Sequence, residues 1–140
     1  MSANSRVRPA TTADIPWILK IAEKRYGPQI EDLGLVEKWL LSTRGEPNVC
    51  FLRSDHAFVV STRIPKFYAP SSPEAGTIFI ASENNSPWET LALLRTSAAW
   101  YKVQGCKAYR IDSATDYDIE PLALRLGAKP VSTTYALRLA

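Results

Sequence analysis

The stretch SENNSPWETLALL, residues 82–94, is where a strand gives way to a helix. The run TIFIAS, residues 77–82, is continuously apolar up to its last residue, which is typical of a strand at the centre of a sheet. A turn from such a strand into a helix can hold a phosphate on the free N–H groups of the helix start. Pro87 and Trp88 occupy this turn where glycines would suit a phosphate. It is therefore either an anion site or a plain helix start.

The helix-start interpretation accounts for the residues of the turn. Ser86 and Glu89 have the spacing of a capping box, in which the serine hydroxyl accepts the Glu89 N–H and the glutamate side chain reaches back. Pro87 suits the first helical position because no N–H is needed there. The Glu89 carboxylate would stabilise a helix start by about 0.5–1 kcal/mol and would repel an anion. These residues favour the capping interpretation.

The following helix is expected over residues 86–104. At 100° per residue its apolar face consists of Leu91, Leu94, Ala98 and Tyr101, widened by Leu93 and Trp100. Arg95 and Lys102 fall on the opposite side. Gly105 is placed to end the helix in the left-handed conformation.

The remaining chain divides into strands, helices and one proline-rich loop. The expected elements are a strand at RVRPAT (6–11), a helix capped by Thr11, Thr12 or Asp14 and ended by Gly27-Pro28, a second helix over about 30–42, a hairpin of NVCFLRS (48–54) and HAFVVSTRI (56–64), a loop over 65–76, a strand at CKAYRIDS (106–113), a short helix from Asp118 and Pro121 to near Gly127, and a closing strand at KPVSTTYALRL (129–139). The order β-α-α-β-β-β-α-β-α-β predicts an α/β fold, with a single mixed parallel/antiparallel sheet flanked by helices.

Composition narrows the class of protein. The 140 residues suit one domain over 1–140, and 46% hydrophobic with 22% charged residues is ordinary for a globular protein. No apolar run is long enough to span a bilayer, and residues 1–14 show no signal-peptide pattern, so we expect a soluble, cytoplasmic protein. The net charge of +3 is mild and its cations are scattered, which argues against a nucleic-acid partner.

The cysteines and the single histidine offer little chemistry. Cys50 and Cys106 lie far apart in predicted strands, which favours reduced, buried thiols, although a disulfide stays open. His56 alone cannot supply a zinc site or a serine–histidine triad, and no metal site is expected. Its place between two strands favours a structural role over that of a base.

Three further stretches are informative in this element order. They are VRPATTADIPWILKIA (7–22), ALLRTSAAWYKVQGCKAYRIDS (92–113) and LALRLGAKPV (122–131). Together they resemble the GCN5-related N-acetyltransferase (GNAT) superfamily, over nearly the whole chain. The single closing strand makes the chain more similar to the compact GNAT-like proteins of tailed phages than to the longer bacterial enzymes.

The resemblance implies acetyl-CoA, or another acyl-CoA, in a cleft between the fourth and fifth strands. Family members hold the pyrophosphate on a Gln/Arg-x-x-Gly-x-Gly/Ala turn, which falls on residues 85–90 here. Trp88 and Thr90 replace both glycines, and a side chain there obstructs the phosphates. The implied cofactor-binding residues are Ile80, Ala81, Ser82, Asn85, Ser86, Trp88, Thr90, Leu91 and Arg95, with Lys102 as a second cation.

The resemblance also implies a general acid and a general base. The family's tyrosine, which protonates the departing CoA thiolate, falls on Ala123, so Tyr117 and Tyr135 become the candidates. The base varies across the family and is often a carboxylate near the fourth strand. Glu83 is the first candidate here. Behind it stand Asp112 and Asp116, and all of these residues also have ordinary structural interpretations.

Two functions follow. One is an acyl-CoA-dependent N-acyltransferase acting on an amine acceptor, with a degenerate pyrophosphate-binding turn. The alternative is a catalytically inactive GNAT-fold protein-binding module, as a phage host-directed effector or virion component in the host cytoplasm, with Trp88 in the vacated cleft. Either could be a monomer or a homodimer, and the sequence names neither an acceptor nor a protein partner.

Overall fold

The computed structural model describes residues 7–112, 119–131 and 134–139. Its elements are β1 (Arg8–Pro9), α1 (Ile15–Tyr26), α2 (Leu33–Arg44), β2 (Val49–Arg53), β3 (Ala57–Ile64), β4 (Glu74–Ser82), α3 (Pro87–Val103), β5 (Ala108–Arg110) and α4 (Glu120–Arg125), with 3-10 turns at Thr12–Asp14 and Gly27–Gln29. The strands form one sheet in the order β1-β2-β3-β4-β5. Neighbours are antiparallel except β4 and β5, which are parallel, so the predicted mixed sheet is confirmed.

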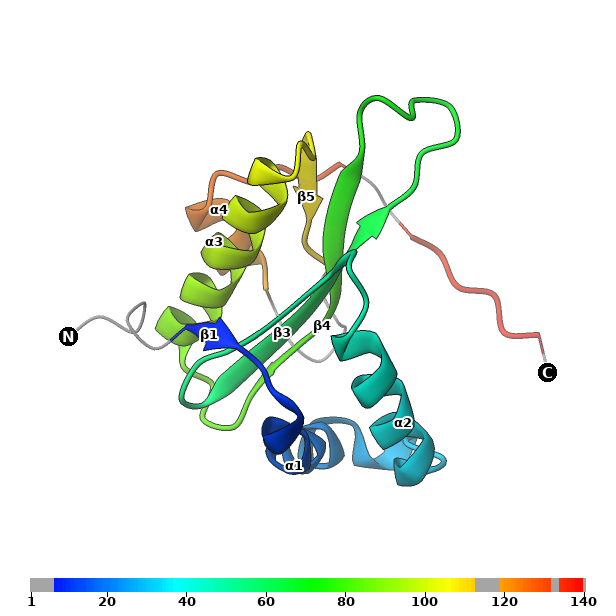
Figure 1. Cartoon of the computed structure of the whole chain (residues 1–140), viewed down its shortest axis with the longest axis vertical. Coiled ribbons are helices and arrows are strands. Elements are labelled where there is room, and N and C mark those ends of the chain that lie inside the picture. The colour runs from blue at the N-terminus through cyan, green and yellow to red at the C-terminus, as the bar shows by residue number, and fades with distance from the viewer. Residues whose placement is uncertain (1–6, 113–118, 132–133, 140) are drawn as a thin grey trace.

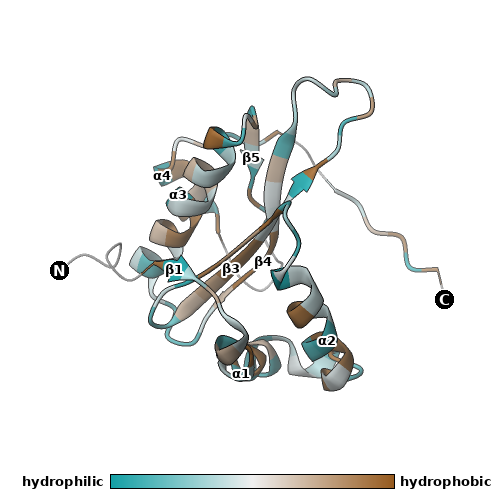
Figure 2. Cartoon of the chain, in the orientation of Figure 1, coloured by the Kyte–Doolittle hydropathy of each residue, from teal (hydrophilic) through white to brown (hydrophobic). Residues whose placement is uncertain are grey.

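Helices cover both faces of this sheet (Figure 1). Side chains alternate along β3, so Phe58 and Val60 pack with α1 and α2, whereas Ala57 and Val59 pack with α3. Both sets are fully buried, and Figure 2 shows β3 as one of the most hydrophobic parts of the molecule. The continuous apolar run of this strand therefore reflects burial on both faces.

A charged cluster fixes the start of the first helix. Thr11 caps the 3-10 turn, and its N–H donates to Asp14 Oδ2 at 2.7 Å. Arg8 and Arg53 lie 3.0 and 2.9 Å from the same carboxylate. Burial alone would raise the pKa of Asp14, but hydrogen bonds from these groups outweigh it and hold the pKa well below its usual range. The Arg53 guanidinium also lies 3.6 Å from the centre of the Trp17 ring.

Several boundaries differ from the predicted ones. The second helix begins at Leu33 rather than near residue 30, because the Asp32 side chain accepts the N–H groups of Gly34 and Leu35. The fourth strand begins at Glu74 inside the predicted loop, since it pairs there with both β3 and β5. Cys106 precedes its strand, while Cys50 is buried in β2, and both thiols are free.

The predicted closing strand is wrong over the described residues of its range. Residues 129–131 and 134–139 form no strand, and the latter extend away from the sheet in Figure 1. Their apolar pattern has the period of a strand, but none of the described strands pairs with them. Over the described ranges, the helices lack the length and apolar character that crossing a bilayer requires.

Candidate functional site

The strand β4 separates from β5 partway along its length. The pairing with β5 runs only from Glu74 to Gly76, after which the Asp112 N–H donates to Thr77 Oγ1 at 3.3 Å. The pairing with β3 shifts at the next residue, because Ile78 is an extra residue between the paired Thr77 and Phe79. Such a bulge bends a strand and increases its local twist. Ile78 is 47% exposed, so this edge of β4 is accessible at the bulge.

Gly76 allows the two strands to approach before they part. A Cβ atom on Gly76 would lie 3.0 Å from Ile64 Cδ1 and 3.2 Å from the Arg110 carbonyl oxygen. Glu74 also stabilises the contact between β4 and β5, since its carboxylate forms ion pairs with Lys66 at 2.9 Å and with Arg110 of β5 at 2.8 Å. Hydrogen bonds from Lys66 and then Arg110 lower the pKa of Glu74. The strands are therefore held together on one side of the bulge.

The turn after β4 is built from local hydrogen bonds. Asn84 Oδ1 accepts the Ser86 N–H at 3.1 Å. Asn85 has a φ of 54°, a left-handed conformation that asparagine tolerates better than most residues. Ser86 caps α3 and its hydroxyl accepts the Glu89 N–H at 3.5 Å. The predicted helix start is confirmed, as is the left-handed Gly105 at its other end, with a φ of +89°.

The second half of the predicted capping box is wrong. The buried Glu89 carboxylate does not return to Ser86 but accepts the Ser54 hydroxyl at 2.6 Å and the His56 N–H at 2.8 Å. Burial alone would raise the pKa of Glu89, yet these hydrogen bonds outweigh it and lower that pKa. The carboxylate accepts hydrogen bonds from the β2–β3 hairpin because that hairpin presents two donors to it. The Ser86 N–H does not need Glu89, since it already donates to Asn84 Oδ1.

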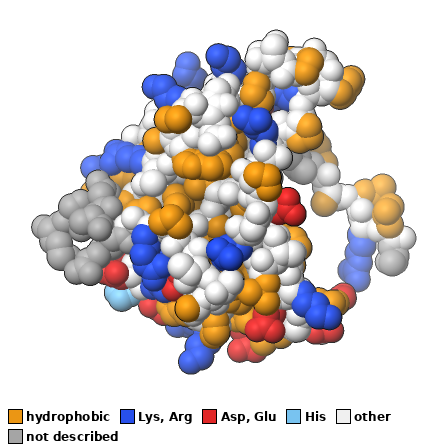
Figure 3. Space-filling model, viewed as in Figure 1, with side chains coloured by type: hydrophobic (Ala, Val, Ile, Leu, Met, Phe, Trp, Pro, Cys, Tyr) orange, Lys and Arg blue, Asp and Glu red, His pale blue; other side chains and the backbone are white. Residues whose placement is uncertain are grey.

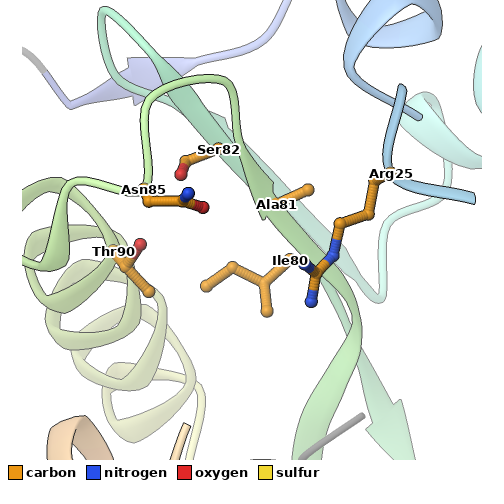
Figure 4. Close-up of a pocket in the computed structure, with 6 residues that line it drawn as sticks. All are labelled: Arg25, Ile80, Ala81, Ser82, Asn85 and Thr90. Atoms are coloured by element: carbon orange, nitrogen blue, oxygen red, sulfur yellow. The ribbon is translucent and has the colours of Figure 1, made fainter. Parts of the chain in front are cut away.

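A small pocket lies between β4, the turn and the end of α1 (Figure 4). Its lining comprises Arg25, Ile80, Ala81, Ser82, Asn85 and Thr90, so five of the nine predicted cofactor-binding residues meet here. Its volume is about 10 Å³, which admits roughly one water molecule. The Thr90 side chain is buried and its hydroxyl donates to the Ser86 carbonyl. Arg25 was not predicted as a residue of this pocket, although the basic residues in the last turn of α1 could have indicated a cation there.

The other predicted cofactor-binding residues lie outside this pocket. Trp88 is 57% exposed, and the Arg125 guanidinium lies 4.8 Å from its ring centre. Trp88 therefore does not line this pocket, and its ring lies against Arg125 of α4. Leu91 is buried in the core, whereas Arg95 and Lys102 are exposed.

Solved structures with this arrangement include acetyltransferases. A GNAT family acetyltransferase from Staphylococcus aureus has a TM-score of 0.69 and 12% identity, covering 95% of this chain and 97% of that one. An aminoglycoside antibiotic 6'-N-acetyltransferase from Acinetobacter baumannii has a TM-score of 0.74 and 14% identity, covering 96% and 97%. The chain has the GNAT fold. A transcriptional regulator from Bacillus halodurans C-125 is also similar, with a TM-score of 0.77, 13% identity and coverage of 95% and 98%.

These identities establish the fold alone, and the three proteins do not share one described role. The sequence matches no protein-family model and no curated protein. The predicted fold class is thus confirmed by the GNAT-fold structures, while the roles of individual residues stay predictions.

In this GNAT fold, Glu83 stands just after β4 in a polar cluster. Its carboxylate accepts the Trp17 Nε1–H at 3.3 Å and lies 3.1 Å from His56 Nδ1. It borders a hollow of about 360 Å³ lined by Lys20, Ile21, Lys24, His56, Glu83 and Asn84. Sequence reasoning set His56 aside. The proximity of His56 to Glu83 follows from the β3–β4 register. Ala57 pairs with Ser82, so His56, which precedes Ala57, lies beside Glu83, which follows Ser82.

Of the two predicted acid candidates, only Tyr135 lies among the described residues. Tyr135 is exposed on residues 134–139, and Tyr117 lies outside the described residues, as does Asp116. Asp112 is exposed beyond the end of β5. Tyr109 is half-buried, with its hydroxyl 2.6 Å from Ser61 Oγ, and desolvation raises its pKa to about 12.

Among the described residues, no group of three or more His, Cys, Asp or Glu side chains could hold a metal ion. Burial raises the pKa of the Cys50 thiol to about 11, so this thiol stays protonated and packs as a small apolar group.

Proposed function

We propose that the protein is an acyl-CoA-dependent N-acyltransferase with a degenerate pyrophosphate turn. The observation that carries this proposal is the parting of β4 from β5 at Gly76, followed by the bulge at Ile78. A strand edge released in this way can pair with an extended ligand, as a further strand would. The pantetheine arm of CoA contains two amide groups and suits such an edge. The GNAT fold, known from N-acetyltransferases, supports this placement.

In the proposed reaction, an amine nitrogen attacks the thioester carbonyl carbon. The new C–N bond forms, the C–S bond breaks, and the CoA thiolate leaves and takes up a proton. A backbone N–H of β4 would stabilise the negative oxygen of the intermediate. Glu83 would accept the proton of the amine, directly or through water. Trp17 and His56 would orient the Glu83 carboxylate, since both contact it.

The pyrophosphate end of the ligand has little support. The pocket at the turn has a volume of about 10 Å³ and Thr90 fills its wall, so the residues present do not fit a pyrophosphate. We assign no step to the turn. Affinity for an acyl-CoA would come from the pantetheine arm along β4.

This closed turn also favours the second candidate, a GNAT-fold protein-binding module. Such a chain would keep the fold and act through contact with another protein, as a phage effector or a virion component would. The two candidates differ in one property, which is amine-dependent cleavage of an acyl thioester.

Release of free thiol from acetyl-CoA, measured with a panel of primary amines, separates them. The panel would include aminoglycosides, amino acids and short peptides. For the enzyme we expect amine-dependent release, and Glu83→Gln should lower kcat/KM by about 10²–10⁴-fold. Glu37→Gln, at an exposed residue of α2, serves as a control for loss of one carboxylate and should retain activity. Release that no amine accelerates would favour the binding module.

A further inference from the structure

Two lysines of α1 line the hollow beside Glu83. Lys20 and Lys24 are four residues apart, so they lie on the same side of the helix, one turn from each other. Both residues are exposed, and among the described residues neither ammonium group has an ion pair or a hydrogen bond. Like charges at this spacing disfavour a helix slightly. The stability of α1 therefore gives no reason for two cations at this place.

The polar side chains across from α1 come from the ends of two strands. His56 precedes β3, while Glu83 and Asn84 follow β4. Among the described residues, the Glu83 carboxylate is the one acidic group that lines the hollow. Two lysines and one carboxylate, with a neutral histidine, leave the hollow with a net positive charge. It therefore offers a place for anionic groups next to a carboxylate that can bind an amine.

The hollow has the size of a site for a small molecule. Its volume of about 360 Å³ lies within the usual range for such sites, about 300–1,000 Å³. On the face that Figure 3 presents, Lys and Arg side chains are spread over the surface with Asp and Glu among them, instead of gathering in one patch. A polyanion such as a nucleic acid requires a broad basic surface. The two lysines therefore suit a small anion.

We infer that the hollow binds a small amine that carries two carboxylates, as an acidic amino acid does. The carboxylates would lie at Lys20 and Lys24, and the amine at Glu83. With its amine protonated, such a ligand has one more negative than positive charge, which is opposite to the charge of the hollow. The role of this amine as the acyl acceptor rests on the proposed function, whereas its binding does not.

As the acceptor, the ligand would change bonds only at its nitrogen. Its ammonium group loses one proton to Glu83, the free amine forms the new C–N bond, and the C–S bond of the thioester breaks. The second proton of the nitrogen goes to the CoA thiolate, which leaves as the thiol. The carboxylates take no part, so Lys20 and Lys24 would contribute to binding and not to the chemical step. A polycationic amine would bring further ammonium groups towards the lysines and should be a poor acceptor.

Calorimetry on the full chain, without acyl-CoA, tests the binding. L-glutamate and L-glutamine are matched probes, because they share their length and their α-amine and differ in one carboxylate. We expect L-glutamate to bind at least about tenfold more tightly at low salt, and the difference to shrink as added salt screens the charges. Lys20→Gln/Lys24→Gln should abolish this preference. Lys38→Gln/Lys107→Gln removes two exposed lysines elsewhere and should keep it.

Thiol release from acetyl-CoA separates this inference from the proposed function. With L-glutamate as acceptor, Lys20→Gln/Lys24→Gln should raise KM by about tenfold and leave kcat nearly unchanged, since the lysines contact only the carboxylates. Preferential, lysine-dependent binding of L-glutamate without any thiol release would support the inference and contradict the acyltransferase. Thiol release with no preference for L-glutamate over L-glutamine would overturn the inference and leave the acyltransferase standing. Equal binding of the two probes, binding of neither, or a preference that survives Lys20→Gln/Lys24→Gln would also overturn it.

Discussion

The carboxylate of Glu89 connects the start of α3 to the β2–β3 hairpin. It accepts one hydroxyl and one backbone N–H there, from Ser54 and His56, and it is buried. Sequence spacing correctly predicts the Ser86 half of this helix cap, because both partners are local. The Glu89 half could not be predicted, because it depends on where a hairpin more than thirty residues earlier packs.

Removing this carboxylate should cost more than removing the cap. Hydrogen bonds to a charged group contribute about 1.5–3 kcal/mol, and Glu89→Ala removes the acceptor of both the Ser54 hydroxyl and the His56 N–H. Ser86→Ala loses one cap bond and should cost about 1 kcal/mol. Urea denaturation of both variants measures the difference. Equal losses would mean that Glu89 acts only as a helix-start residue.

Acid should destabilise the protein through three carboxylates. The pKa values of Asp14, Glu74 and Glu89 are all lowered in the folded state, by hydrogen bonds and ion pairs that outweigh burial where burial opposes them. A group with a lowered folded pKa contributes stability above its unfolded pKa, about 4 for these residues, and loses it as pH falls through the folded pKa. We therefore expect the free energy of unfolding to fall below about pH 5.

Asp14→Asn isolates the largest of these effects. The variant should be less stable than the unmodified protein at pH 7, and the difference should shrink as the pH falls towards 2. Urea titrations at several pH values give the comparison. A difference that stays constant with pH would contradict the lowered pKa of Asp14.

At the scale of elements, α3 shows what periodicity can predict. Its predicted range, residues 86–104, includes both caps of the observed helix, and Leu94 is fully buried as expected. Leu94→Lys should therefore destabilise the protein by about 3–5 kcal/mol, because an unpaired charge enters the core. Arg95→Ala, one residue further on an exposed side, should change stability by less than about 0.5 kcal/mol. Thermal and urea unfolding compare the two, and similar losses would show that the helix is rotated.

Other elements depend on partners that a local pattern does not reveal. The hairpin of β2 and β3 was predicted because its strands are adjacent and strongly apolar. The first three residues of β4 were missed, since Glu74 to Gly76 lie in a proline-rich stretch and become a strand by pairing on both sides. Residues 134–139 have a strand pattern but no partner within the described chain.

At the scale of the whole molecule, alternating and helical apolar patterns were sufficient to predict one mixed sheet flanked by helices, and the resemblance of three stretches to a known family added the GNAT fold. They were insufficient for the candidate site. The proximity of His56 to Glu83 follows from the β3–β4 register, and the closure of the turn follows from how Thr90 and Arg25 pack around it. Of the two residues that replace the family's glycines, Thr90 lines the pocket and Trp88 does not.

Opening the turn should restore phosphate binding if β4 holds an acyl-CoA. Thr90→Gly removes the side chain from the pocket wall, whereas Trp88→Gly removes an exposed side chain that does not line it. We expect Thr90→Gly to bind acetyl-CoA at least about tenfold more tightly, equal to about 1.4 kcal/mol, and Trp88→Gly to bind with little change. Calorimetry gives both affinities, and equal gains in the two variants would contradict the assignment of Thr90.

The most direct test compares acetyl-CoA with S-acetyl-pantetheine, which lacks the pyrophosphate, by calorimetry on the unmodified protein. If β4 binds the pantetheine arm and the turn is closed to phosphate, both ligands should bind with affinities within about threefold, a difference below 1 kcal/mol. Acetyl-CoA binding more than about a hundredfold tighter would show a working phosphate site at the turn. Binding of neither ligand would contradict the acyl-CoA site itself.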